Sequence, residues 1–506
     1  MEKPIEKIVI VGGGTAGWLC AAILASKHLL DPGSNKKIVL VESPDIQSVG
    51  VGEGTWPTMR RTLNQIGISE QEFLSKCNAS FKQGTRFLGW RDGSQGDDFF
   101  HPFSLPVGFP KINPGTAWLE NSMGTDFAKV FSVQPHLCEL NLAPKHFKTP
   151  EYNGMQNYGY HLDAGKFADL LRRHSVQKLN VQHIQANVEQ VHRNESGNIF
   201  ALTTDSAADI TGDFFVDCTG FHAKLISQTM GAEFNSTGRT LFADRALVVS
   251  KEYERPDSPV ASQTNSVALS AGWVWDIGLK DRRGLGYVYS SSHISEEVAL
   301  NEFVSHLCAS EGDFDEGTVR SLKFESGYRP TPWINNCIAI GLSAGFVEPL
   351  EASSIMMTEL ASNFLADRWP VSDSIIPILS KQFNDIFSSR WLRIVDFLKL
   401  HYCLSKRQTD FWMDNTSSSS IPDSLAEKLE LWKFHTPWRD DFTYAQEMFP
   451  TASYQYILYG MKNLNPITES SCVVSQNTHA AVLSKVNQLK GVLPSNRDLI
   501  GSCSIL

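Results

Sequence analysis

The fold of this chain is decided by the stretch Ile8-Val9-Ile10-Val11-Gly12-Gly13-Gly14-Thr15-Ala16-Gly17-Trp18. Its four β-branched residues predict a buried strand, and the Gly-x-Gly-x-x-Gly turn after them predicts the opening of a helix. Gly12 permits the tight turn, Gly14 lets the backbone approach a pyrophosphate, and Gly17 lets helix and strand pack closely. Thr15 and Ala16, the first residues of the helix, would offer backbone N–H groups to that pyrophosphate.

A second predicted strand, Lys37–Val41, ends in Glu42. A carboxylate at that strand end can accept a ribose hydroxyl, which favours an adenosine ribose without a 2′-phosphate. Together, the strand, the glycine turn and the acid predict a site for an ADP-containing cofactor. The alternative is a glycine-rich turn between strand and helix that binds no ligand.

The composition bounds the class of protein. The 506 residues could supply two or three domains' worth of core, and 42% hydrophobic with 20% charged residues are ordinary for a soluble globular protein. The net charge of −10 argues against nucleic acid or an anionic membrane as a partner, because both attract basic surfaces. The nine cysteines include no Cys-x-x-Cys pair, so we expect neither a metal site nor a disulfide framework.

The sequence also carries no visible targeting segment. Glu2, Lys3, Glu6 and Lys7 lead directly into the first strand, which leaves no room for a signal peptide. No uninterrupted apolar run reaches the roughly 18 residues that a membrane span needs. We therefore expect a cytoplasmic protein.

Three separated glycine turns favour FAD over NAD. The strand-like stretches Asp213–Gly220 and Ile338–Gly345 each end in glycine, and a flavoprotein of the monooxygenase type returns to its cofactor in this way. The alternative for each is a core strand that ends in a turn. Because no second Gly-x-Gly-x-x-Gly is present, reduced flavin would come from a separate flavin reductase. The residues expected along the FAD are Gly12, Gly14, Thr15, Ala16, Gly17, Glu42, Val51, Gly52, Val188, Gly220, Gly341, Phe346 and Leu350.

The expected fold class is α/β, with an FAD-binding Rossmann-like domain of the glutathione-reductase or aromatic-monooxygenase type and a second β-sheet. We place this domain at residues 1–375, with an irregular insertion at 91–157 that covers the substrate site. Residues 376–506 are expected to form a mostly helical subdomain over the substrate. Within it we expect a surface linker at 415–422 and one amphipathic helix at 480–489.

The ordered motifs resemble those of the flavin-dependent tryptophan halogenase family over most of the chain. One mark of that family, Trp-x-Trp-x-Ile-Pro, reads Trp273-Val-Trp275-Asp-Ile277-Gly278 here, with glycine in place of the proline. So many matches in order are far more specific than a glycine motif alone. The other matches are Val49–Thr55, Phe81-Lys82, His101-Pro-Phe103, His161–Ala164, Asp217–Phe221, Phe346–Glu351, His401–Ser405 and Phe411-Trp412.

The resemblance implies a defined chemistry. Reduced FAD and O2 give a flavin hydroperoxide, a bound halide attacks its distal oxygen, and hypohalous acid is released inside the protein. A lysine then holds the halogen as a haloamine or by hydrogen bonding. A carboxylate helps to activate the electrophile or takes the proton of the aromatic ring. Lys82 matches the family lysine, and Glu351 matches the family glutamate.

Both residues also have ordinary structural interpretations. Burial among Phe81 and other apolar neighbours would lower the pKa of Lys82 toward a nucleophilic amine; otherwise Lys82 is a solvated strand residue. Glu351 opposite a cation is a plausible proton acceptor; otherwise it is an acid favoured by the dipole at a helix N-terminus.

The resemblance also implies a halide site after Glu351, where backbone N–H groups at a helix N-terminus can bind an anion. The family usually has Ser-Thr-Gly there, whereas this chain has Ala352-Ser353-Ser354. Ser353 and Ser354 are therefore the candidate halide residues, and the departure leads us to expect bromide, with chloride as the alternative. Trp273 and Trp275 are expected to separate flavin from substrate, or else to be core aromatics.

Three residues are expected to contact the substrate. His101 and Phe103 match the family pair that stacks on an indole, and such a sandwich suits any flat electron-rich ring. Tyr454 lies in the C-terminal segment that would hold an amino acid, but that segment continues as 462–465 with neither an acid nor a tryptophan. We therefore expect indole or a simple substituted indole rather than free tryptophan. The assembly could be a homodimer.

The predicted function is that of an FADH2-dependent halogenase acting on a small aromatic substrate. Two other functions stay open. A flavin-dependent aromatic monooxygenase would need neither Lys82 nor halide. A flavin-binding protein without turnover would bind FAD and give no halogenated product, although the presence of Lys82 and Glu351 argues against it.

Overall fold

Strand β1 (Lys7–Val11) lies inside a six-stranded sheet of the computed structural model, which describes residues 4–31, 33–46, 52–119, 126–311, 316–442, 447–462 and 473–503. The strand order is β20 (Trp333–Ile334), β21 (Cys337–Ala339), β12 (Phe214–Asp217), β1, β2 (Lys37–Glu42) and β8 (Gln182–Gln185). All neighbours are parallel except β20 and β21. The carboxyl ends of the parallel strands therefore meet at one edge, where α/β sheets bind their ligands.

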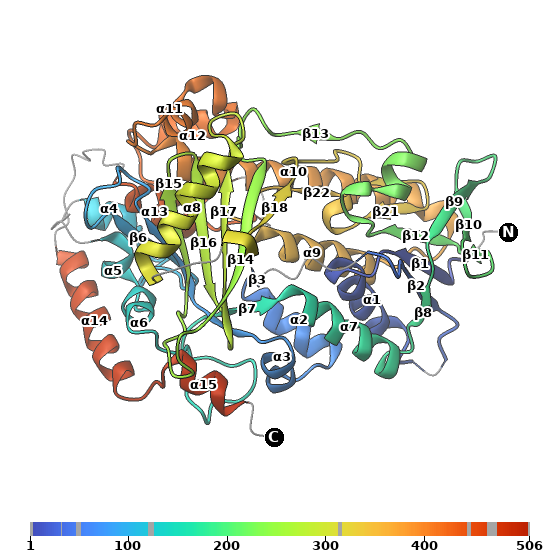
Figure 1. Ribbon diagram of the computed structural model, residues 1–506, viewed down its shortest axis with the longest axis horizontal. Coiled ribbons are helices and arrows are strands. Elements are labelled where there is room, and N and C mark those ends of the chain that lie inside the picture. Colours follow the sequence, from blue (N-terminus) through green and yellow to red (C-terminus); the bar gives the residue numbers. More distant parts are fainter. Residues whose placement is uncertain are drawn as a thin grey trace.

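Helix α1 (Thr15–His28) begins directly after the glycine turn, as predicted. Its residues from Gly17 to Ala25 are all buried, because the helix packs against both α7 (Ala164–Lys178) and α9 (Ser353–Asp367) (Figure 1). This strand, turn and helix, with the parallel sheet around them, confirm the predicted fold class.

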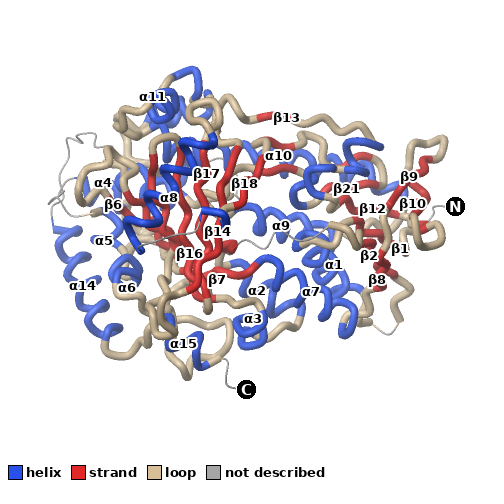
Figure 2. Tube along the Cα trace, viewed as in Figure 1, coloured by secondary structure: helices blue, strands red, loops and turns tan. Residues whose placement is uncertain are grey.

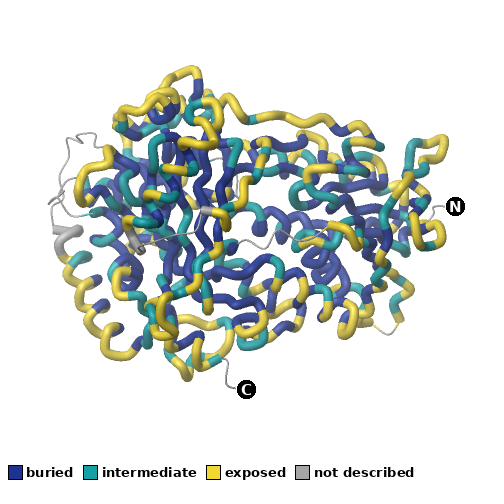
Figure 3. The backbone as a smooth tube through the Cα atoms, in the orientation of Figure 1, coloured by how far each residue is buried: buried dark blue, intermediate teal, exposed yellow. Residues whose placement is uncertain are grey.

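A second, seven-stranded sheet forms the other half of the molecule (Figure 2). Helix α8 (Glu296–Glu311) covers one face, where Ala299, Phe303 and Leu307 pack on strand residues. Trp273 and Val288 on other strand positions belong to the main hydrophobic core, so both faces are covered and the strands are largely buried (Figure 3). The strand order is β18 (Arg320–Lys323), β14 (Arg245–Glu252), β17 (Arg282–Tyr289), β16 (Gly272–Gly278), β15 (Thr264–Leu269), β5 (Gly84–Leu88) and β6 (Asp98–Pro102).

Three small sheets complete the β-structure. In one of them, β7 (Gly159–Asp163) lies between β3 (Gly52–Gly54) and β4 (Ser80–Lys82). The connection from β3 to β4 contains α2 (Thr58–Ile66) and α3 (Glu70–Lys76). The sheet places Gly54 next to the amine of Lys82. The other two sheets are β9 (Val188–Arg193), β10 (Ile199–Thr204) and β11 (Ile210–Thr211), and β13 (Asn235–Ser236), β19 (Gly327–Tyr328) and β22 (Gly345–Phe346).

The C-terminal part is helical. Helix α10 (Ile376–Cys403) contacts β20 of the first sheet and also α11 (Asp410–Thr416), α12 (Asp423–Leu431) and α13 (Thr451–Gly460). Side chains from α1, α10 and α13 share one hydrophobic core. The division of the chain into domains at 375/376 stays a prediction. Among the described helices, none is both long and apolar enough to cross a membrane.

The structure corrects three details of the sequence analysis. The segment 91–157 is not irregular throughout, since it contains β6, α4 (Pro114–Leu119), α5 (Phe127–Phe131) and α6 (Gln134–Glu139). The segment 415–422 is exposed at residues 416–419, as predicted, but it is anchored rather than a plain linker, because Asn415 and Ser420 are buried and the Ser420 hydroxyl donates to the Asp414 carbonyl at 2.9 Å. The helix predicted at 480–489 extends as α14 (Val473–Lys490), and α15 (Asn496–Ser502) follows it.

Candidate functional site

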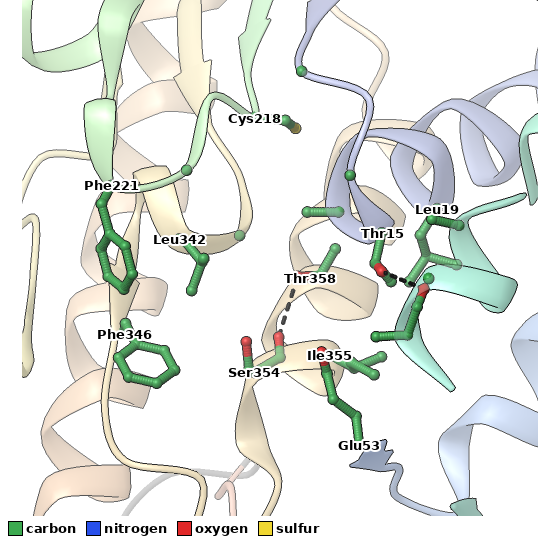
Figure 4. Close-up of a pocket in the computed structure, with 18 of the residues that line it drawn as sticks. Thr15, Leu19, Glu53, Cys218, Phe221, Leu342, Phe346, Ser354, Ile355 and Thr358 are labelled. Atoms are coloured by element: carbon green, nitrogen blue, oxygen red, sulfur yellow. Dashed lines mark hydrogen bonds between the residues drawn. The ribbon is translucent and has the colours of Figure 1, made fainter. Parts of the chain in front are cut away.

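A cavity of about 1170 Å³ lies at the carboxyl edge of the first sheet and extends to β16 and β17 of the second. Figure 4 shows Thr15 on one side of this space and Leu342 and Phe346, four residues apart in the chain, on the other. Most of the residues expected along FAD line this cavity, namely Gly12, Gly14, Thr15, Ala16, Glu42, Gly52, Val188, Gly220, Gly341, Phe346 and Leu350.

One predicted cofactor residue of the described chain, Gly17, does not line the cavity. Gly17 lies behind the turn, where a Cβ atom would be 1.9 Å from the carbonyl oxygen of Gly12. This contact requires glycine and allows the close approach of helix and strand. Val51 lies outside the described residues.

The start of α1 fits a pyrophosphate. Its N-cap, Gly14, supplies no side chain to cap the helix, and the first turn contains no acidic residue. A Cβ atom on Gly14 would meet no protein atom within 4 Å, so the cavity reaches the backbone itself. The free N–H groups and the helix dipole then favour an anion at this position.

Glycines hold the three turns close together. Gly12 has φ +117°, and a Cβ atom there would lie 2.1 Å from the carbonyl oxygen of Cys218 after β12. Gly341, after β21, has φ +75° and its Cβ position is 2.6 Å from Cβ of Ala16. Gly220 also has a positive φ, +67°. The three glycine turns of the sequence therefore converge on one cavity.

Glu42 lies at the end of β2, on the lining of the cavity. His183 of β8 is 2.8 Å from its carboxylate, between Nε2 and Oε2. A carboxylate at this place fits the ribose of an adenosine. Glycine turns, an open helix N-terminus and this acid together form a donor and acceptor set that suits FAD.

Lys82 is the last residue of β4 and is 3% exposed. Its Nζ lies 5.5 Å from the centre of the Phe103 ring, and it makes no hydrogen bond or ion pair with any described residue. Burial lowers the pKa of the Lys82 amine to about 8, against the opposing effect of the Glu351 carboxylate. A Cβ atom on Gly54 would lie 3.0 Å from this Nζ, and Lys82 lines the cavity.

Glu351 lies just before α9 and is also buried. Its Oε1 is 2.9 Å from Nδ1 of His101 and 3.1 Å from Nε2 of His401. Burial by itself would raise the pKa of this carboxyl, but the two histidines outweigh it and hold the pKa well below its usual range. The backbone carbonyl of Glu351 accepts a hydrogen bond of 2.7 Å from Nε1 of Trp56.

The N-terminus of α9, like that of α1, has no side-chain cap. Its N-cap, Ala352, has φ +53°, no side chain caps the helix, and the first turn has no acidic residue. Ser354 lines the cavity and Ser353 is buried beside it. In Figure 4, Thr358 is joined to Ser354, whose carbonyl accepts its hydroxyl at 3.1 Å. Backbone N–H groups here could bind a halide.

The structure separates the predicted substrate residues. His101 has both ring nitrogens engaged, because Nε2 lies 2.9 Å from Oγ of Ser453. Phe103 lies beside Lys82. Tyr454 is buried against Phe397, at 4.9 Å between ring centres, and does not line the cavity.

Trp273 and Trp275 both line the cavity from β16. The ring of Trp275 lies over Gly286 of β17, where a Cβ atom would be 2.1 Å from Cη2. Gly286 thus leaves the space that this ring fills. Gly278, which stands where the family has proline, ends β16 and pairs with Arg283.

Sequence reasoning missed the role of three residues in the site: Trp56, His401 and Ser453. His401 belongs to a quoted motif, but nothing in its local sequence shows that it meets a carboxylate 50 residues away. Ser453 and His101 are 352 residues apart in sequence. In the part of the chain that is described, no group of three His, Cys, Asp or Glu side chains is arranged to hold a metal ion.

Comparisons with known proteins agree over almost the whole chain. A profile of the tryptophan halogenase family matches residues 7–474. The tryptophan 7-halogenase RebH of Lentzea aerocolonigenes is 32% identical over 464 residues, 87% of this chain and 85% of RebH. A solved tryptophan halogenase from Shewanella frigidimarina is 42% identical with a TM-score of 0.94, over 100% of this chain and 98% of that one. BrvH, a flavin-dependent halogenase from Brevundimonas, is 32% identical with a TM-score of 0.87, over 99% of both chains.

Proposed function

Because this chain belongs to the tryptophan halogenase family, we propose that it halogenates a free indole-type aromatic by way of Lys82. It is a flavin-dependent halogenase, an enzyme that uses FADH2 and O2. The substrate, the halide and the part played by each residue belong to the proposal.

FAD would be held by the glycine turns and Glu42, with its pyrophosphate at the start of α1. When bound as FADH2 it supplies, with O2, the oxidising equivalents that turn halide into hypohalous acid. Backbone N–H groups at the start of α9, from Ser353 and Ser354, would hold the halide. Trp273 and Trp275 would keep the aromatic substrate away from the flavin.

One observation carries the proposal: Lys82 lines the cavity and also lies beside the ring of Phe103. Its side chain lines the cavity, and its Nζ lies 5.5 Å from the centre of the Phe103 ring. With a pKa of about 8, a useful fraction of the amine is uncharged and nucleophilic near neutral pH. Lys82 can therefore take the halogen on the cavity side and present it to a ring beside Phe103.

Glu351 is proposed as the acceptor of the ring proton. Its carboxylate is buried, ionised and electrostatically coupled to Lys82. A proton acceptor in contact with the reacting ring typically contributes about 10²- to 10⁴-fold to the rate. The two histidines both bind Oε1, and Oε2 makes no hydrogen bond with the described residues.

For the substrate we propose indole or a simple substituted indole, with bromide as the halide. RebH and several other relatives are named tryptophan halogenases, and Tar14 is named a tryptophan C-6 chlorinase, so tryptophan and chloride are the direct competitors. Support for indole comes from Tyr454, which is buried against Phe397 and does not line the cavity. FADH2 would diffuse from a separate flavin reductase, and a homodimer stays a prediction.

The test is mass spectrometry of products from an aromatic panel that contains indole and tryptophan, with FAD, NADH and a flavin reductase. Chloride and bromide are compared at equal concentration. We expect brominated indole as the main product. Oxygen gained without halogen would instead identify an aromatic monooxygenase, and bound FAD without any product would identify a flavin-binding protein without turnover.

A further inference from the structure

His401 completes the buried surroundings of Glu351, and its hydrogen bonds fix where its protons lie. Nδ1 is 2.8 Å from the backbone carbonyl of Phe397, which can only accept, so Nδ1 carries a proton. Nε2 is 3.1 Å from Oε1 of Glu351. If both groups lacked a proton here, two lone pairs would face each other at hydrogen-bond distance in a buried site. The contact between Glu351 and His401 therefore contains one proton.

The position of this proton follows from the charge around it. His101 also contacts Oε1, through Nδ1 at 2.9 Å, while its Nε2 can accept from the hydroxyl of Ser453. Two donors on one carboxylate oxygen favour the ionised acid. The shared proton then lies on Nε2 of His401, which becomes an imidazolium, and Oε2 of Glu351 stays free of hydrogen bonds to the described residues.

The end of α10 holds the whole loop before α9. His401 binds Glu351, and the next residue, Tyr402, donates its hydroxyl to Oε1 of Glu348 at 2.6 Å. Both acids belong to the segment Phe346–Glu351. Two consecutive residues of one helix thus fix the loop that leads into the candidate halide site.

Few other titratable groups face the pair. Lys82 approaches from β4 and His101 from β6, and the phenol of Tyr456 on α13 lies beside His101 with its hydroxyl bound to the carbonyl of Ser104. The remaining neighbours of His401 are the rings of Phe87, Trp90 and Phe397. Two further titratable groups, Glu348 and Tyr402, lie on the same loop and the same helix as the pair and bond each other at 2.6 Å.

We propose that His401 is a positioning residue that stores a proton beside Glu351, so that the buried carboxylate stays ionised and offers Oε2 as a base. The proposal rests on the halogenase function above. The charge of His401, on α10, then determines the pH range over which Glu351 is ionised and can accept a proton. His401 itself does not line the cofactor cavity.

The transfer of the halogen from Lys82 to the ring conserves atoms and electrons. The N–halogen bond of a haloamine at Lys82 breaks while a carbon–halogen bond forms on the ring. The ring C–H bond then gives its electron pair back to the ring and its proton to Oε2 of Glu351. That proton passes to the nitrogen of Lys82, which returns to the amine. The proton on His401 is neither consumed nor released.

The first test replaces the stored charge by a neutral donor. His401→Gln keeps an N–H group for Oε1 but cannot carry a positive charge, so burial would favour the protonated form of Glu351. The acid side of the rate profile should therefore move to higher pH. We expect the ratio of variant to wild-type halogenation rate to be about tenfold lower at pH 6 than at pH 9.

Controls separate this effect from a loosened loop and from a failure of the proposed function. Tyr402→Phe removes the neighbouring bond to Glu348 and leaves both histidines in place, so a rate loss that it shares with His401→Gln at every pH measures the loosened loop. Hypohalous acid trapped without an aromatic substrate should form equally in wild type and His401→Gln. A His401→Gln ratio that is the same at pH 6 and pH 9, while wild type halogenates, would overturn the inference alone. If wild type makes no halogenated product, the proposed function fails instead.

A second measurement uses wild-type protein and does not depend on the folding of His401→Gln. Histidine labelled with ¹⁵N should show, at pH 8, one ring with both nitrogens protonated. This signal should disappear in Glu351→Gln, which removes the carboxylate. A wild-type spectrum in which every histidine is neutral at pH 8 contradicts the stored proton.

Discussion

The cofactor cavity and the buried charges around Glu351 are built by opposite means. The cavity depends on backbone, since the start of α1 has no side-chain cap and glycines allow the turns to meet. The cluster depends on side chains, because the carboxylate of Glu351 is held by imidazoles from β6 and α10. The cavity should therefore tolerate substitutions that keep the backbone shape, whereas the cluster depends on the identity of each partner side chain.

The largest effect is expected where the two regions meet, at Lys82. Lys82→Met should lower halogenation by about 10³-fold or more, because the amine that receives the halogen is gone. FADH2 oxidation should persist, since the glycine turns and Glu42 that would hold the flavin are unchanged. Rates of bromoindole formation and of oxygen consumption check both parts.

Two further observations sharpen this test of Lys82. Lys82→Arg keeps a cation without a nucleophilic amine and should be as inactive as Lys82→Met. Thermal unfolding of Lys82→Met should shift to higher temperature, because burial disfavours the charged amine whose pKa is lowered to about 8. Bromoindole formed at the wild-type rate by either variant would remove Lys82 from the mechanism.

The next largest effect is expected within the cluster. Glu351→Gln should lower halogenation by about 10²-fold, because the amide cannot accept the ring proton. Glu359→Gln is the matched control on α9, the helix that follows Glu351, since burial raises the pKa of Glu359 to about 7 and its carboxylate binds Thr58 and Thr62. Steady-state halogenation rates compare the two, and equal losses would contradict a special role for Glu351.

Within the cavity, glycine substitutions should act in two different ways. Gly14→Ala places a methyl group in open space on the lining and should weaken FAD binding by about tenfold, or ~1.4 kcal/mol, without changing the stability of the protein free of FAD. Gly12→Ala collides with the carbonyl of Cys218 and should instead lower that stability by about 2 kcal/mol. FAD titration and thermal unfolding distinguish them.

Gly501 offers a control for these two substitutions. It lies in α15, and a Cβ atom there also meets nothing within 4 Å. Gly501→Ala should stabilise slightly and leave FAD binding unchanged. Equal FAD affinities for Gly14→Ala and Gly501→Ala would show that the pyrophosphate does not lie at the start of α1.

The smallest effect is the pH dependence of the wild-type reaction. With a pKa of about 8, roughly a tenth of the Lys82 amines are uncharged at pH 7 and nearly all are uncharged above pH 9. If the free amine is the nucleophile, halogenation with excess FADH2 should rise by about tenfold from pH 7 to pH 9. A rate that falls over this interval would favour a charged Lys82 that holds hypohalous acid by hydrogen bonding.

The same contrast explains what could be predicted from the sequence. The first glycine turn, Gly12–Gly17, can be recognised from consecutive residues alone. The parallel pairing of β1 with β2 and β12 then brings all three turns to one edge of the sheet. A short motif on each strand was therefore enough to predict the fold class and part of the lining of the cavity.

The cluster around Glu351 could not be predicted in this way. Its partners are 250 residues away at His101 and 50 residues away at His401, and no periodicity links them. His101 lies on β6 at the edge of the second sheet, within a segment that its proline and glycine content had marked as irregular. Such contacts depend on how whole elements pack, and local sequence carries no record of that packing.

Gly54 keeps space open beside the amine of Lys82. Its missing side chain leaves a gap between Nζ of Lys82 and Cβ of Ala352, where a methyl group would lie 3.0 Å and 3.4 Å from these atoms. Any larger residue at position 54 would therefore press at once on the amine proposed to receive the halogen and on the N-cap of α9. The absent methyl group keeps these two parts of the proposed reaction in the same space.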